Sequence, residues 1–282
     1  MRIALGISYN GSGYHGWQSQ LSGNTVQDHL ETALTRFAVQ RITTNCAGRT
    51  DSGVHGLMQV VHFDTDTVRD AASWVRGTNA FLPSDIAVQW AREVPDAFHS
   101  RACAVSRRYV YVLLQSPVRP SVEAGRVGWV FRPLNEAALQ QAAGYLVGKH
   151  DFTSFRASAC QALSPVKHLQ HIGISRRATL AHVDAGAVSA DRPEHQEFAT
   201  CYWRFEFEAN AFLHHMIRNL MGCLVAVGAG KYPPTWVLDV LAARSRDAAA
   251  PTFAADGLYF LGPVYEDHWG LPKHAPAYDW LP

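Results

Sequence analysis

Strand-like and helix-like patterns alternate along this chain in two similar series, one in each half, and this limits the choice of fold more than any other feature. In the first series, residues 2–9 alternate as a strand, and Thr25 and Asp28 stand where a capping box begins a helix. Apolar residues then recur at i, i+4, i+7, i+8 and i+11, which marks one helical face. They are Val26, Leu30, Ala33, Leu34 and Phe37. Further strands are predicted at 59–63 and 86–94, with a helix over 69–80 between them.

The second series follows the same order. A β-rich run covers residues 108–115, and Asn135 is placed to cap a helix. That helix carries Leu139, Ala142, Ala143 and Leu146 on one face and closes at Gly148. We expect paired antiparallel strands at 169–175 and 201–208, an exposed loop at 178–196, helices over 211–229 and from Pro233 through Ala243, and a last strand at 257–262. The expected fold is therefore α+β, with two similar units that each form a largely antiparallel sheet backed by helices, divided into residues 1–104 and 105–282.

Composition narrows the class of protein further. A chain of 282 residues has room for about two domains, and 48% hydrophobic with 17% charged residues exclude a disordered chain. The five cysteines are scattered and odd in number, which favours a reducing compartment over a disulfide framework. The first residues hold too short an apolar stretch for a signal peptide, and the longest apolar helical candidate carries several polar residues. We expect a cytoplasmic globular protein without a membrane span.

Arginine is unusually abundant and unevenly placed. The chain has 21 arginines and 4 lysines, and between Arg101 and Arg132 six arginines stand against a single acid, Glu123. Because arginine makes bidentate phosphate contacts and stacks on bases, this bias favours a nucleic-acid partner. A GC-rich genome produces the same bias, so composition alone leaves both interpretations open.

Several motifs suggest chemistry that their surroundings do not support. Residues 11–16 match G-x-G-x-x-G, but eight residues separate the third glycine from the predicted helix, which favours a glycine-rich loop over a dinucleotide cradle. Asp51-Ser52-Gly53 lacks the second carboxylate that an aspartic protease requires. The histidines at 168 and 171, and at 214 and 215, have no carboxylate or thiol at ligand spacing, so we expect no metal.

The segment from Cys46 to Gly56 is the strongest candidate for a functional loop. Its three glycines permit backbone conformations that let the loop approach a ligand closely. Asp51 follows Arg49 by two residues, and a neighbouring cation favours the ionised carboxylate. From the residues alone, a ligand-binding loop and an ordinary turn with a local ion pair both remain open.

This loop closely resembles the catalytic motif of the TruA family of tRNA pseudouridine synthases, and the resemblance covers about residues 2–265. Blocks in the family's order lie at residues 4–18, 107–111, 150–156, 210–219 and 257–259. Ser52 stands where alanine is common in the family. The resemblance implies the pseudouridine synthase fold, with two pseudo-twofold halves around a central basic cleft. It also implies a homodimer that acts on uridines 38, 39 and 40 of the tRNA anticodon stem-loop.

The resemblance also implies roles for individual residues. Asp51 corresponds to the essential aspartate, and Tyr109 to the tyrosine that stacks on the target base. Arg49 and Arg218 correspond to arginines near that aspartate, and Leu258 would line the base pocket. Arg107 and Arg108 belong to the arginine-rich segment expected to hold tRNA phosphates. Ordinary structural roles remain open for Tyr109 as a core residue and for Arg218 as a helix-end residue.

The implied reaction breaks the bond from C1′ to N1 of uridine and makes one from C1′ to C5. Because the product is an isomer, no redox cofactor, nucleotide or metal is expected. The carboxylate either adds covalently or abstracts a ribose proton, and the residues do not decide between these routes. The base must leave the helical stack, and its stacking on an aromatic ring contributes about 1–3 kcal/mol. The Tyr109 hydroxyl is a candidate acceptor for the C5 proton.

Three alternatives compete with this hypothesis. An RNA-binding module could keep the fold without catalysis, although the presence of Asp51 argues against it. A pseudouridine synthase could act on another RNA or other positions, because specificity lies in backbone contacts and shape more than in the motif. A dinucleotide oxidoreductase is a distant third.

Overall fold

The computed structural model of the chain describes residues 1–178 and 200–272. Apart from Ala178, the predicted loop at 178–196 lies outside the described residues. By their internal contacts, the described residues form two compact units. The first contains residues 1–109 and the described residues from 259 onward, and the second contains the described residues between 110 and 258. Within the described ranges, no helix is long and apolar enough to cross a membrane.

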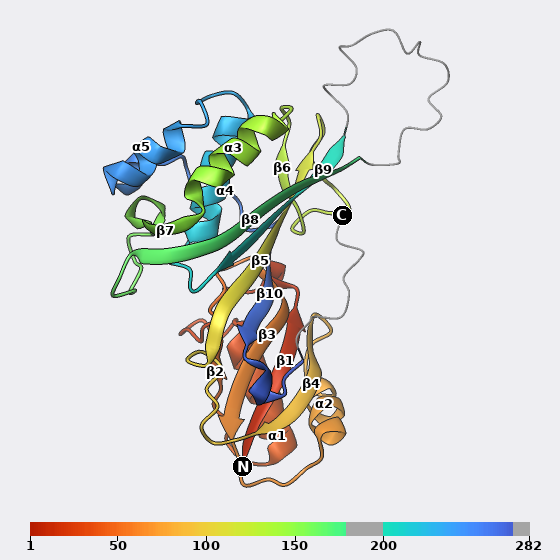
Figure 1. Ribbon diagram of the computed structural model, residues 1–282. Coiled ribbons are helices and arrows are strands. Elements are labelled where there is room, and N and C mark those ends of the chain that lie inside the picture. The colour runs from red at the N-terminus through yellow and green to blue at the C-terminus, as the bar shows by residue number, and fades with distance from the viewer. Residues whose placement is uncertain (179–199, 273–282) are drawn as a thin grey trace. The chain divides into compact units, whose positions relative to one another are not determined.

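The first unit is a sheet in the strand order β4-β1-β3-β10-β5, with β2 also paired to β3 (Figure 1). Its elements are β1 (Arg2–Tyr9), α1 (Val26–Ala38), β2 (Asn45–Cys46), β3 (His55–Asp64), α2 (Ala71–Asn79), β4 (Ile86–Val94), the start of β5 (Ala104–Gln115) and most of β10 (Leu258–Tyr265). Strand β1 pairs antiparallel with both β3 and β4, whereas β10 pairs parallel to β3. A strand from the end of the chain therefore lies between two strands from its first half.

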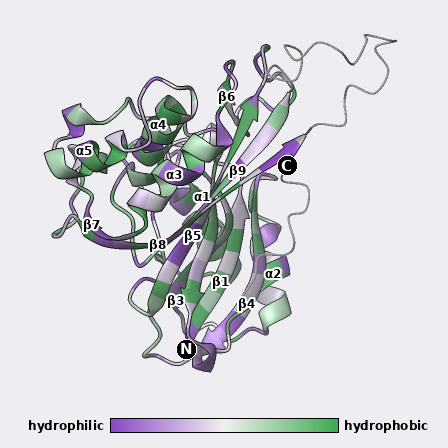
Figure 2. Cartoon of the chain, turned by 45° about the horizontal axis from the view of Figure 1, so that its top comes forward, coloured by the Kyte–Doolittle hydropathy of each residue, from purple (hydrophilic) through white to green (hydrophobic). Residues whose placement is uncertain are grey.

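Both faces of this sheet are covered. Alternate residues of β1 point to one face, where Ile3, Leu5 and Ile7 pack with apolar residues of α1 and α2. Ala4 points to the other face, where the cluster includes Phe98 and is covered by Tyr265 and Trp269 from the end of the described chain. The alternation of hydrophobic and hydrophilic residues along the strands is visible in Figure 2. The sheet is thus a buried middle layer.

The predicted start of α1 is confirmed. The Thr25 side chain accepts a hydrogen bond from the Asp28 backbone N–H, as an N-cap residue does. The predicted face of this helix is buried at Val26, Leu30, Ala33 and Leu34, and Phe37 packs partly buried against the same cluster. The cap and the apolar spacing together account for the position of α1.

The second unit contains the end of β5 and the strand order β5-β9-β8-β7, with β6 paired parallel to β5. Its other elements are β6 (Gly128–Val130), α3 (Glu136–Leu146), β7 (Gly148–Asp151), β8 (Val166–Ala178), β9 (Cys201–Ala209), α4 (Met216–Gly228) and α5 (Trp236–Ala243). Strands β8 and β9 pair antiparallel, as predicted, with Ile172 opposite Phe207. Helices α3, α4 and α5 lie together beside β8 (Figure 1). The observed architecture is the expected α+β class.

The helices of the second unit follow the predicted pattern, except that α4 and α5 begin later than predicted, α5 at Trp236 and not at Pro233. Helix α3 buries the four predicted residues, and the Asn135 side chain accepts from the Ala138 N–H at its start. Helix α4 begins at Met216 and not at residue 211. The reason is local, because His215 adopts a left-handed backbone conformation with φ of 62° and so ends the preceding segment.

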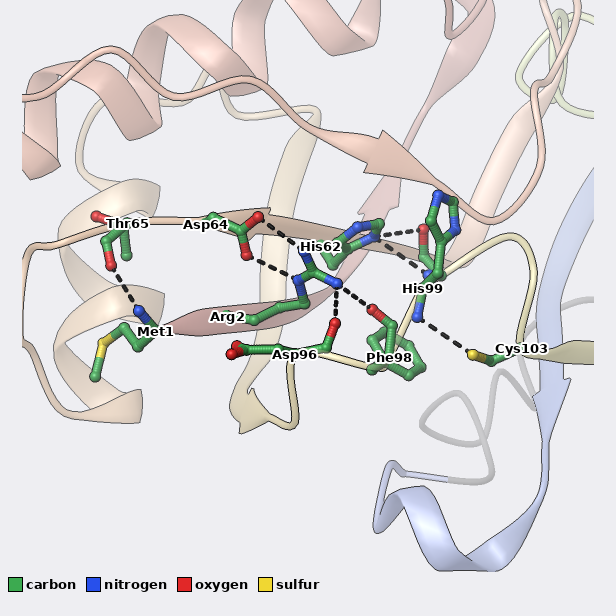
Figure 3. A network of polar contacts seen from close by, with 10 residues as sticks. Met1, Arg2, His62, Asp64, Thr65, Asp96, Phe98, His99 and Cys103 are labelled. Carbon is green, nitrogen blue, oxygen red and sulfur yellow. Dashed lines mark hydrogen bonds and ion pairs between the residues drawn. The ribbon is translucent and has the colours of Figure 1, made fainter.

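A polar network joins β1, β3 and the segment after β4 (Figure 3). Arg2 forms two hydrogen bonds of 2.8 Å with Asp64 and also donates to the Phe98 carbonyl. Beside this pair, His62 Nδ1 lies 3.0 Å from the Ser100 hydroxyl and accepts from the Ser100 N–H. Burial, together with the neighbouring His99 and Arg2, lowers the pKa of His62 to about 4. His62 is therefore neutral in the folded protein near pH 7.

We predict that stability falls on acidification because of His62. In the unfolded chain its pKa is about 6.5, so between pH 6.5 and 4 the unfolded state takes up a proton that the folded state does not. The free energy of unfolding should therefore have its full value above pH 6.5 and fall by about 1–3 kcal/mol as the pH is lowered to 4. His62→Gln should flatten this slope in urea titrations between pH 4.5 and 7.5, whereas His15→Gln, at an exposed position, should not. Equal slopes in all three proteins would contradict the assignment.

Candidate active site

The loop between β2 and β3 is held at alternate residues. Gly48, Thr50 and Ser52 each make hydrogen bonds to other parts of the first unit. Between them lie Arg49, which is exposed, and Asp51, which is half-buried. Hydrogen bonds at Thr50 and Ser52 hold the backbone on both sides of Asp51, and the Val54 N–H donates to the Asp51 carbonyl across a turn at Ser52 and Gly53.

Gln59 holds the first of these residues. It lies in β3, is fully buried, and its amide nitrogen donates to the Gly48 carbonyl at 2.5 Å. Its amide oxygen lies 3.4 Å from the Gly48 nitrogen, which donates to it. Gln59 thus satisfies both backbone groups of a residue that has left the sheet ladder.

Thr50 is held through both its side chain and its backbone. The Thr50 hydroxyl lies 2.8 Å from the Tyr9 hydroxyl, and both residues are buried. The Thr50 carbonyl accepts from the Trp17 N–H at 3.0 Å. Two residues later, the Ser52 hydroxyl donates to the Tyr14 carbonyl at 3.1 Å. Residues 9–17 therefore form the support on which this loop rests.

The glycines of the G-x-G-x-x-G pattern allow that support to come close. A Cβ placed on Gly11 would lie 2.0 Å from the Val54 carbonyl oxygen, and one on Gly16 would lie 2.8 Å from the Thr50 carbonyl oxygen. Gly16 also has φ of +88°, which favours glycine. Residues 11–13 form a short 3-10 turn, and no helix opens at Gly16. The close approach that the pattern signals is to protein backbone, as expected for a glycine-rich loop without a dinucleotide.

Tyr109 lies beside the loop within the same unit. A Cβ placed on Gly48 would be 3.8 Å from the Tyr109 hydroxyl and 3.5 Å from the Phe260 ring. The Tyr109 and Phe260 rings are 4.8 Å apart and tilted by 33°. Burial raises the pKa of Tyr109, and the nearby Tyr9 and Asp51 raise it further. The structure thus brings Asp51 into the electrostatic surroundings of a tyrosine that stays protonated.

Two further side chains define the surroundings of the loop. Burial raises the pKa of the Cys46 thiol to about 11, although Arg49 and Arg101 act in the opposite direction. Cys46 is therefore a thiol at neutral pH and a poor nucleophile. Arg107 donates to the carbonyls of Ala47, Arg101 and Ala104, and burial lowers its pKa. Its guanidinium ties β5 to the residue that precedes Gly48.

Arg108, Arg218 and Leu258 complete the predicted residues. Arg108 is partly exposed on β5. Arg218 lies in the first turn of α4, where its Nε donates to the Phe253 carbonyl at 2.9 Å. Leu258 is buried at the start of β10, and its N–H donates to the Ala255 carbonyl. Arg218 and Leu258 belong to the second unit, and Asp51, Arg49, Tyr109, Arg107 and Arg108 belong to the first.

Sequence reasoning did not single out Gln59, Tyr9 or Phe260. One signal was present for Gln59, because an amide in the middle of an apolar strand must find buried hydrogen-bond partners. Tyr9 and Phe260 look like ordinary alternating strand residues. Their importance depends on which loop they face, and only the folded chain supplies that information.

We predict that Gly11 and Gly13 respond very differently to alanine. A Cβ at Gly11 would overlap the Val54 carbonyl, whereas a Cβ at Gly13 would meet nothing within 4 Å. Gly11→Ala should therefore lower the free energy of unfolding by about 1–3 kcal/mol, and Gly13→Ala should leave it nearly unchanged. Urea unfolding followed by fluorescence would measure both. If Gly13→Ala lost as much stability as Gly11→Ala, the close approach of Gly11 to the Val54 carbonyl would not be the reason for glycine in this segment.

Comparisons with known proteins show the family of this chain. A protein family described as tRNA pseudouridine synthase matches residues 7–101 and 142–266. Proteins named tRNA pseudouridine synthase A from Delftia acidovorans, Polaromonas sp. and Acidovorax ebreus are 68%, 70% and 69% identical to the chain. Each of these alignments spans the whole length of both proteins. The chain that builds this loop therefore belongs to the tRNA pseudouridine synthase family.

Proposed function

We propose that this protein converts uridines 38, 39 and 40 of the tRNA anticodon stem-loop to pseudouridine, with Asp51 as its catalytic carboxylate. The observation that carries the proposal is the loop that holds Asp51 half-buried between fastened residues, close to the buried Tyr109. As a member of its family, the protein is an isomerase that acts on tRNA. The anticodon positions rest on the resemblance of its motifs.

The reaction needs one carboxylate and a base that has left the stack. The bond from C1′ to N1 breaks, the base turns, and a bond from C1′ to C5 forms. The proton on C5 is then lost, and N1 gains one, so no electrons leave the substrate. Asp51 either adds to the substrate or removes a ribose proton, and both routes require its ionised form.

Tyr109 suits a role in stacking better than a role as phenolate base. Because burial raises its pKa, the hydroxyl keeps its proton near pH 7. Its ring presents an aromatic surface for a flipped base, which stacking stabilises by about 1–3 kcal/mol. We assign Tyr109 to base stacking, and its hydroxyl to a hydrogen bond that can pass the C5 proton onward.

The arginines divide into two groups in this proposal. Arg49 and Arg218 act near the reacting nucleotide, and Leu258 lines the pocket for the base. For the tRNA backbone, Arg108 is the better of the two predicted contacts, because the guanidinium of Arg107 donates to three protein carbonyls. Phosphate contacts of this kind weaken as salt rises.

We also propose a cytoplasmic homodimer. The cytoplasm is where a tRNA substrate is found, and the dimer follows from the family resemblance. Light scattering should then give about twice the chain mass of 31.1 kDa. A mass of one chain at working concentration would remove the dimer from the proposal.

We predict that Asp51→Asn abolishes isomerisation without abolishing tRNA binding. Asparagine keeps the size of the side chain but cannot act as an ionised carboxylate. Tritium release from tRNA labelled at uridine C5 should fall by at least about a thousandfold, while the Kd for tRNA stays within about threefold.

Three outcomes would contradict the proposal in different ways. Equal tritium release by wild type and Asp51→Asn would remove Asp51 from the mechanism. No release by wild type despite tight tRNA binding would favour an RNA-binding module. Release from uridines other than 38, 39 and 40, identified with single-uridine tRNA variants, would leave the chemistry intact and correct the substrate positions.

A further inference from the structure

A buried chain of polar side chains runs from β3 through β1 to the residue before Asp51. Gln59 hydrogen-bonds Gly48 and also Tyr9, and the Tyr9 hydroxyl bonds the Thr50 hydroxyl at 2.8 Å. Gln59, Tyr9 and Thr50 are 0%, 4% and 6% exposed. Both ends of this chain of contacts thus reach the same loop, at positions two residues apart.

Tyr9 has little freedom to move. A Cβ on Gly56 would lie 2.4 Å from the Tyr9 ring, so the ring packs directly on the backbone of β3. On another side, the ring lies 5.7 Å from the ring of Trp17, a residue whose backbone N–H donates to the Thr50 carbonyl. The Tyr9 hydroxyl is therefore a fixed point within the sheet.

Burial makes this contact sensitive to small changes. Burial raises the pKa of Tyr9, so its hydroxyl stays neutral and can both donate and accept. If either hydroxyl is removed, the other loses this partner in a buried place where water does not easily replace it. Without the Tyr9 hydroxyl, Thr50 regains a partner by moving. Without the Thr50 hydroxyl, Tyr9 keeps its bond to Gln59 but no longer holds the loop. In both cases a movement of Thr50 moves the next residue, Asp51.

We propose that Tyr9 is a positioning residue for Asp51 and acts through the Thr50 hydroxyl, with Gln59 holding the other side of the loop at Gly48. This inference rests on the proposed function, in which Asp51 is the catalytic carboxylate. Tyr9 does not touch the substrate. It sets where the carboxylate stands when the substrate arrives.

The consequence is a change in rate without a change in tRNA affinity. A catalytic group displaced by about 1 Å can cost about a hundredfold in rate. Tyr9→Phe keeps the ring packing and removes only the hydroxyl, and Thr50→Val removes the other partner at similar volume. Each should lower the single-turnover rate of pseudouridine formation at saturating enzyme by about 10- to 100-fold. The Kd for tRNA should stay within about threefold of wild type.

A double-mutant cycle separates this contact from general softening of the fold. Because both substitutions break the same hydrogen bond, the double variant should be no more than about threefold slower than the slower single variant. Tyr265→Phe is the matched control, since its partly buried hydroxyl in the same unit donates to the Ser100 carbonyl at 2.6 Å and lies outside the loop. Tyr265→Phe should keep the wild-type rate and show a similar change in melting temperature to Tyr9→Phe.

Each other result overturns the inference. A wild-type rate in Tyr9→Phe or Thr50→Val, rate losses that multiply in the double variant, or an equal rate loss in Tyr265→Phe would each exclude positioning through this contact. A rate loss that is seen only at subsaturating enzyme, and that weaker tRNA binding fully explains, would exclude this role too. Asp51→Asn is measured alongside. If it is inactive while Tyr9→Phe is unchanged, the positioning role alone fails, and if Asp51→Asn is active, the proposed function fails.

Discussion

The hydrogen bonds between the Gln59 side chain and the backbone of Gly48 are the constraint on which the rest of the site depends. A loop with three glycines loses much conformational freedom on folding, and it has no regular ladder to compensate for that loss. The Gln59 side-chain amide takes the place of a neighbouring strand, because it hydrogen-bonds the backbone of a residue that lies beyond the last paired residue of the sheet. Gly48 meets Gln59 through its backbone alone, and a Cβ placed on it would make only ordinary van der Waals contacts with Tyr109 and Phe260.

The electrostatic surroundings of the loop follow from the same burial. Tyr9, Tyr109 and Cys46 all have pKa values raised by burial, so none carries a negative charge at neutral pH. Tyr109, whose pKa Asp51 raises, is therefore a neutral neighbour of that carboxylate, while the guanidinium of Arg107 donates to the backbone at Ala47. Apolar packing, more than a set of charges, determines which groups near the loop ionise.

Local signals in the sequence were sufficient for most elements and for part of the site. The caps at Thr25 and Asn135 and the apolar faces behind them were readable, because each depends on residues within one or two turns. The start of α4 was not, since the left-handed conformation of His215 has no marker such as glycine. The division into residues 1–104 and 105–282 remains a prediction. Strand β10 joins the first unit through a pairing with His55 and Gly56, about 200 residues away, which no local pattern indicates.

The pairing of β10 with strands from much earlier in the chain has a consequence for folding during translation. Strand β10 occupies the place between β3 and β5, and the residues after it cover the second face of the same sheet. During synthesis, the sheet of the first unit therefore lacks a strand between β3 and β5 until residues 258–265 have emerged. Phe260, which packs against Tyr109, arrives with this last strand. A chain terminated before β10 would lack Phe260, so the aromatic contact with Tyr109 forms only after that strand has been synthesised.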